Sequence, residues 1–151
     1  KGFDIIEILT VTDEHIAELS AEMIKHGEKS GLTFFLRDAE NLQHADAVIL
    51  IGTKTKTHGL NCGYCGFQTC EEKLQHEEIP CSLNSVDVGI AVGSACATAA
   101  DMRVDSRVMF SAGRTAQEIG WMPGCSNIYG IPISCSSKNP FFDRRTTRPI
   151  G

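Results

Sequence analysis

Ala45-Asp46-Ala47-Val48-Ile49-Leu50-Ile51-Gly52 is the stretch that decides the fold, because it is almost continuously apolar and ends in glycine. A strand that is covered on both faces has this pattern, so residues 45–52 predict the central strand of a sheet. Residues 3–11 are rich in β-branched side chains and predict another strand, and residues 127–133 predict a final one. A small sheet with helices around it is therefore expected.

The segments between these strands predict helices and one more short strand. In chain order they are a helix capped by Thr12 and closed at Gly27, a short edge strand at 32–36, a brief helix capped by Asp38, and two longer helices at 86–101 and 106–119. The helix at 86–101 has small, apolar side chains on all sides and is therefore expected to be buried, whereas the helix at 106–119 is amphipathic. Together they predict a single α/β (or α+β) domain over residues 1–151, with a small central sheet flanked by helices and an inserted cysteine-rich loop at 58–81.

Composition excludes several classes of partner. The net charge is −5 and no Lys/Arg run exceeds two residues, so neither nucleic acid nor an anionic membrane surface is an expected partner. The charge-free run from Val88 to Ala100 is too short to span a bilayer. Seven cysteines without a secretory signal predict a reducing, cytoplasmic setting. Because the chain opens on Lys1 rather than methionine, we expect that the protein has a further N-terminal segment, which this sequence does not include.

The cysteine-rich loop leaves directly from the end of the predicted central strand. In open α/β sheets, functional loops gather at this edge, which favours a site here. The string Asn61-Cys62-Gly63-Tyr64-Cys65-Gly66-Phe67-Gln68-Thr69-Cys70, with Cys81 following, has the pattern C-x2-C-x4-C-x10-C. Glycines at 63 and 66 permit a tight turn with positive φ, in which amide groups approach the sulfurs.

Three interpretations of these thiols remain open on the residues alone. Four thiolates bind either a structural zinc or an iron–sulfur cluster, and disulfides or unligated thiols are the third alternative. Structural zinc sites more often present two close pairs with a long spacer between them. Here three cysteines lie together and Cys81 stands apart, an arrangement that favours a cubane cluster.

These motifs resemble those of a known family, whose members are uncharacterised prokaryotic proteins described as containing a ferredoxin domain. The resemblance rests on residues 61–70, 87–95, 104–109 and 130–144. The cysteine loop also resembles the small iron–sulfur module of electron-transport subunits and corrinoid iron–sulfur proteins, which has a longer gap to its fourth cysteine. The resemblance implies that a [4Fe–4S] cluster is bound by Cys62, Cys65, Cys70 and Cys81. Because Cys81 departs from the module's spacing, His76, Glu77 or a more distant thiol is the alternative fourth ligand.

A second candidate region is the tail. Lys138, Asn139 and Arg144 are candidates to hold an anionic cofactor or substrate, whereas Phe141 and Phe142 are candidates to anchor the tail to the core or to a partner chain. Other cysteines, Cys96, Cys125 and Cys135, are interpreted as packing residues. His58 and His76 are interpreted as solvent-exposed loop residues.

The leading hypothesis is a cytoplasmic redox or electron-transfer protein with one [4Fe–4S] cluster, whose donor and acceptor are a partner protein or a small molecule. One alternative is an oxidoreductase of the flavin-dependent, nitroreductase-like kind with FMN, a distant resemblance at the level of the fold. The other is a protein-interaction domain stapled by zinc. A homodimer is expected, because Gly89, Gly93 and Ala97 recur at helical spacing and allow close helix packing.

Overall fold

A computed structural model describes residues 5–142 of the chain. The elements in chain order are β1 (Ile6–Val11), α1 (Asp13–Ser30), α2 (Thr33–Leu42), β2 (Ala47–Lys54), α3 (Cys70–Leu74), α4 (Ser82–Asp101), β3 (Asp105–Ser106), α5 (Phe110–Glu118), β4 (Cys125–Ser134) and the short 3-10 helix η2 (Pro140–Phe142). Within these residues the strands form one antiparallel sheet in the order β1-β2-β4-β3. This confirms the predicted mixed α/β domain with a small sheet flanked by helices.

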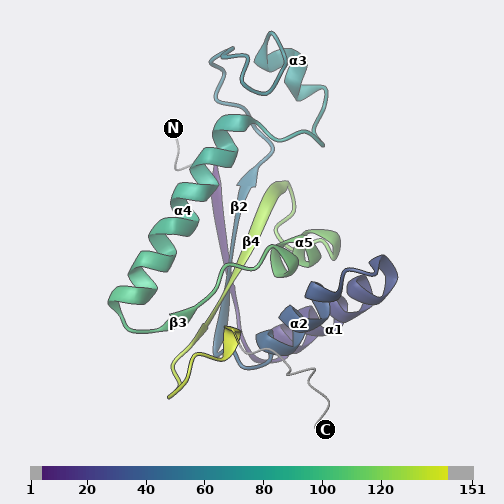
Figure 1. Ribbon diagram of the computed structural model, residues 1–151. Helices are drawn as coiled ribbons and strands as arrows, with labels where there is room; N and C mark the ends of the chain where they lie inside the picture. Colours follow the sequence, from purple (N-terminus) through teal and green to yellow (C-terminus); the bar gives the residue numbers. More distant parts are fainter. Residues whose placement is uncertain (1–4, 143–151) are drawn as a thin grey trace, which may run out of the picture.

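The strand β2 is central, and its alternate side chains enter two different apolar clusters. Val48 and Leu50 are fully buried among α1, α2 and α5, whereas Ile49 and Ile51 contact α4 on the opposite face. Figure 1 shows this arrangement, with α4 on one side of the sheet and α1, α2 and α5 on the other side. The continuous apolar run of β2 therefore reflects coverage on both faces, as its sequence predicts.

Every described strand pair is antiparallel, so the rule for open α/β sheets, which concerns mainly parallel strands, does not explain the position of the loop. The cysteine loop nevertheless leaves from the end of β2, where Lys54 pairs with Cys125 at the start of β4. The loop and α3 lie at one end of the sheet, and η2 lies at the other end (Figure 1).

The predicted edge strand at 32–36 and the cap at Asp38 are also wrong, because a single helix, α2, covers both. Two adjacent phenylalanines suggest a strand locally. However, Phe35, Ala39 and Leu42 recur at helical spacing and are fully buried against α1, so tertiary packing determines the conformation.

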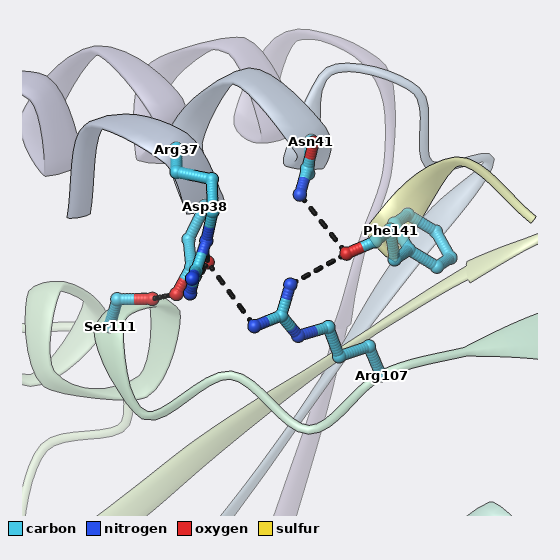
Figure 2. Close-up of polar contacts among 6 residues, drawn as sticks. All are labelled: Arg37, Asp38, Asn41, Arg107, Ser111 and Phe141. Atoms are coloured by element: carbon cyan, nitrogen blue, oxygen red, sulfur yellow. Dashed lines mark hydrogen bonds and ion pairs between the residues drawn. The ribbon is translucent and has the colours of Figure 1, made fainter. Parts of the chain in front are cut away.

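Asp38 is a buried charge inside α2 and is held by a polar cluster, shown in Figure 2. Arg37 donates to Asp38 Oδ1 from Nε and Nη2 at 2.9 and 2.7 Å, and Ser111 Oγ donates to Oδ2 at 2.6 Å. Arg107 Nη2 lies 3.8 Å from Oδ1. Both carboxylate oxygens are therefore satisfied, which is the condition for a tolerable buried charge.

The same cluster fixes the tail. The carbonyl oxygen of Phe141 accepts a hydrogen bond from Asn41 Nδ2 at 3.0 Å and another from Arg107 Nη1 at 2.6 Å (Figure 2). The Phe141 side chain is fully buried, and the Arg107 guanidinium lies over the exposed ring of Phe142. The expected anchoring of the tail on the core is thus seen at Phe141.

The helix α5 begins later than predicted, because Asp105 and Ser106 pair with β4 as the short strand β3. Its first turn approaches β4 very closely. A Cβ placed on Gly113 would lie 1.9 Å from the carbonyl oxygen of Ile128, so this position requires glycine.

The helix α4 differs most from its prediction. A helix buried on all sides is expected from its sequence, but only Asn84 and Val88 are buried, and Val86 and Ile90 are 58% and 66% exposed. By length and composition alone, α4 is long and apolar enough to cross a membrane, and only 17% of its most apolar stretch is buried in the fold. One face rests on the sheet and the other is uncovered, because a single helix cannot bury both sides against one sheet.

Candidate metal centre

The cysteine loop is shaped by glycines whose backbone adopts the left-handed conformation. Gly59, Gly63 and Gly66 have φ values of 69°, 73° and 90°, in the region that favours glycine. The amide of Gly66 donates to the carbonyl oxygen of Gly63 at 2.9 Å and closes a tight turn around Cys65. The turn expected from the C-x2-C spacing is therefore present.

Asn61 joins the start of the loop to its end. The backbone N–H of Asn61 donates to the Sγ of Cys70 at 3.4 Å, and the side-chain Oδ1 of Asn61 accepts from the backbone N–H of Cys70 at 2.8 Å. Thr69 caps α3 by accepting from the amide of Glu72 at 3.1 Å, which holds Cys70 at the first residue of the helix. The third cysteine is thus positioned by backbone and cap contacts.

All four predicted cysteines line one small hollow. Its walls are formed by Thr57, Asn61, Cys62, Gly63, Cys65, Phe67, Thr69, Cys70 and Cys81. Cys81 is buried at the start of α4, and the three loop cysteines are more exposed. Within residues 5–142, no three His, Cys, Asp or Glu side chains are gathered closely enough to hold a metal ion.

The helix α4 is tied to the loop at the hollow. Ser82 Oγ donates to the carbonyl oxygen of Tyr64 at 2.9 Å, which connects the first turn of α4 to the Cys62–Cys65 turn. The N-terminus of a helix carries partial positive charge, so this end of α4 favours anionic groups such as thiolates near Cys81. Four thiols therefore line a hollow beside a helix end of suitable polarity, and a bound centre would have to draw their sulfur atoms closer together than they lie in the described residues.

Hydrogen bonds to sulfur lower the pKa of the Cys70 thiol below its ordinary value. The amide of Asn61 is the largest cause, and burial opposes it by favouring the neutral thiol. Thr57 and the amides of Gly59 and Leu60 act in the same direction as Asn61. Thiolate is the form that binds metals, and donors aimed at sulfur stabilise it.

The other residues proposed from the loop sequence do not line the hollow. His76 stacks on Phe67 with ring centroids 5.1 Å apart, and its Nδ1 lies 3.5 Å from Glu78 Oε1. Glu77 is exposed. Of the proposed fourth ligands only Cys81 faces the hollow, although this assignment stays a prediction.

His58 and the remaining thiols have other settings. His58 is not solvent-exposed as predicted, because its Nε2 pairs with Asp87 Oδ2 of α4 at 3.0 Å and its side chain is 16% exposed. Cys125 is buried, and burial raises the pKa of its thiol. Cys96, which belongs to α4, packs against the face of the sheet that this helix covers, and Cys135 is exposed.

The tail candidates are not brought to the hollow. Asn139 Oδ1 accepts from the amide of Phe141 at 3.0 Å, so this oxygen stabilises the turn that precedes η2. Lys138 is exposed at the same turn. Neither residue lines the hollow, and η2, which follows them in the chain, lies at the opposite end of the sheet from the cysteine loop (Figure 1). Arg144 lies outside the described residues.

Two buried polar residues at the base of the loop were missed from the sequence. Lys73 is 1% exposed and Asn84 is 1% exposed. The string Glu71-Glu72-Lys73-Leu74 has the composition of a solvated helix, and Asn84 lies in an otherwise ordinary helix start. No sequence pattern indicates their burial, which depends on how α3 and α4 fold back over residues 54–57.

Comparisons with known proteins identify the family of the chain. Residues 77–144 match a family described as "Uncharacterized protein containing a ferredoxin domain". A relative from Archaeoglobus fulgidus, described as an uncharacterized protein, is 38% identical over 152 residues, which cover 95% of this chain and 82% of the relative. The chain belongs to this ferredoxin-domain family. The resemblance seen in its motifs is thereby confirmed.

Membership in the ferredoxin-domain family indicates an iron–sulfur protein that transfers electrons. The matched residues include Cys81, α4, α5 and β4, and they begin after Cys62, Cys65 and Cys70. The assignment of individual ligands therefore depends on the hollow and on the cysteine spacing rather than on the family match.

Proposed function

We propose that this protein carries one [4Fe–4S] cluster, held by Cys62, Cys65, Cys70 and Cys81, and passes single electrons between a donor and an acceptor. The observation that carries the proposal is that all four cysteines line one hollow. The three-plus-one spacing of these cysteines, and the ferredoxin domain of the family, support a cluster. The donor and acceptor are a partner protein or a small molecule.

The residues of the chain position and tune the thiolates in this proposal. Amides near Asn61 donate to the sulfur of Cys70, and such bonds stabilise negative charge and influence reduction potential. Phe67 forms an apolar part of the wall, which lowers the local dielectric. A bound cluster supplies one-electron redox chemistry without forming a bond to a substrate.

Protein purified without oxygen is expected to contain iron and acid-labile sulfide in nearly equal amounts, about four of each per chain. The solution should be brown and should bleach when dithionite is added. Iron, sulfide, zinc and flavin are quantified in the same preparation. Colourless protein with one zinc per chain would instead support the zinc-stapled domain, and yellow protein that releases FMN in acid would support the flavin reductase.

The homodimer stays a proposal, supported by the uncovered face of α4. This face carries Val86, Gly89, Ile90 and Gly93, and no charged residue lies between Asp87 and Asp101. Two negatively charged copies approach most easily through such an uncharged surface, because it places no like charges in contact.

Replacing Ile90 with lysine is expected to convert a dimer into a monomer, because the two-fold contact would then bury two unpaired ammonium groups. Leu32, 43% exposed beside the opposite helical layer, provides the matched control Leu32→Lys. Sedimentation equilibrium at micromolar concentration measures the mass of each variant. A monomeric wild-type protein, or a dimeric Ile90→Lys protein, would contradict the proposal.

A further inference from the structure

Lys73 is an unusual residue for the position that it occupies. It lies in the short helix α3, whose neighbouring residues Glu71, Glu72 and Leu74 are exposed, yet its own side chain is 1% exposed. Lysine normally keeps its ammonium in water even when its methylene stem is buried. A fully buried lysine therefore requires a compensating interaction.

The contacts that the chain gives to Lys73 do not include a negative charge. Its Nζ donates to the carbonyl oxygen of Thr55 at 3.3 Å, and in the described part of the chain it forms no ion pair. An ammonium has three donors, and one neutral acceptor satisfies only part of them. Burial of such a cation is unfavourable unless an anion lies nearby.

Lys73 does not line the four-cysteine hollow itself, but it is close in the chain to residues that do. Cys70, which lines the hollow, begins the same helix one turn earlier, and the amide of Lys73 donates to the carbonyl oxygen of Thr69 at 3.2 Å. Thr55, its acceptor, is two residues before Thr57, which also lines the hollow. The side chain of Lys73 thus joins α3, which presents Cys70, to the segment that follows β2.

Asn84 is the second buried polar residue at the base of the loop. Its Nδ2 donates to the carbonyl oxygens of Lys54 and Lys56 at 3.0 and 2.6 Å, while its Oδ1 has no partner among the described residues. Lys73 and Asn84 together therefore engage three successive carbonyl groups where the chain enters the loop. These hydrogen bonds hold the ammonium at a defined place.

We propose that Lys73 provides a fixed positive charge that compensates an anionic cluster in the hollow and raises its reduction potential. This inference rests on the proposed function. Four thiolates make the bound centre anionic, and uptake of one electron from a reductant adds a further negative charge without any proton being required. A nearby buried cation stabilises the reduced form more than the oxidised form, because the attraction grows with the negative charge and is weakly screened.

The test compares two charge-removing variants, Lys73→Met and Lys73→Gln, with the control Lys56→Met. Lys56 belongs to the same segment but is exposed, so removing its charge affects a solvated site. Gln at position 73 keeps a donor for the Thr55 carbonyl and loses the charge. Each protein is reconstituted with iron and sulfide without oxygen, and its midpoint potential is measured by optical redox titration.

Both Lys73 variants are expected to lower the ratio of reduced to oxidised cluster about tenfold at the wild-type midpoint, which corresponds to about 59 mV for a one-electron couple. The Lys56→Met protein should change this ratio less than about twofold, because its charge is screened by water. A wild-type midpoint in either Lys73 variant would overturn the proposal and leave Lys73 as a tether for Thr55.

Stability without the cluster gives a second, independent readout. In the metal-free protein, Lys73→Met is expected to leave the unfolding midpoint unchanged or to raise it, because it removes a buried cation without a counter-charge. A marked loss of stability in the metal-free Lys73→Met protein would show that the lysine is held for structure and would overturn the proposal. Failure of the wild-type protein to take up iron and sulfide would overturn the proposed function and this inference together, whereas unchanged potentials in cluster-loaded variants would overturn this inference alone.

Discussion

Serine at position 65 is expected to abolish cluster binding while leaving the domain folded. Cys65 lies on the glycine turn of the loop, outside both apolar clusters of the core. Changes to residues that only support a ligand commonly reduce metal affinity about 10- to 100-fold, so loss of a ligand itself should reduce bound iron at least tenfold. Iron per chain and circular dichroism, measured on protein reconstituted without oxygen, check the two parts of this result.

Matched variants identify the ligand set. Cys135→Ser removes an exposed thiol just beyond the end of β4 and is expected to keep its iron. Cys81→Ser is expected to lose iron as Cys65→Ser does, and His76→Ala to keep it, because Cys81 faces the hollow and His76 does not. Full iron content in the Cys65→Ser protein would show that the ligands are misassigned.

Among the glycines of residues 5–142, replacement of Gly113 with alanine is expected to reduce stability most. The new Cβ would lie 1.9 Å from the carbonyl oxygen of Ile128 and 2.4 Å from its carbon, and neither backbone atom can move without separating α5 from β4. Overpacking of this severity destabilises a domain by about 3 kcal/mol or more. Urea unfolding of the metal-free protein measures the change.

The control for this prediction is the same substitution in another helix. A methyl group added at Gly93 in α4 would have no atom within 4 Å, and this glycine adopts a helical conformation. Gly93→Ala should therefore stabilise the monomer by up to about 1 kcal/mol through helix propensity. Equal effects of the two substitutions would contradict the close approach of α5 to β4.

The polar cluster around Asp38 shows how local signals and tertiary structure diverge. From the sequence, Asp38 has the character of a helix cap, and no local pattern links it to Arg107. In the fold they meet across 69 positions of the chain, and Arg107 also binds the carbonyl oxygen of Phe141. Such a contact depends on the simultaneous placement of α2, the β3–α5 connection and η2, and no local window contains it.

The sequence by itself determined the elements whose signals are local and strong. The apolar run of β2 requires cover on both faces, the acidic first turn after Thr12 begins α1, and the C-x2-C-x4-C spacing with its glycines produces a turn that directs thiols to one side. These features follow from backbone conformation and side-chain periodicity within a few residues.

Only the tertiary structure decided which of these elements are covered and what they bring together. It made the sheet antiparallel, turned residues 33–42 into a helix against α1, and left one face of α4 exposed. It also placed Cys81 in one hollow with the loop cysteines and buried Lys73 against the carbonyl of Thr55. Burial depends on contacts between segments far apart in the chain, and the free energy of those contacts overrides the weaker preferences of each local stretch.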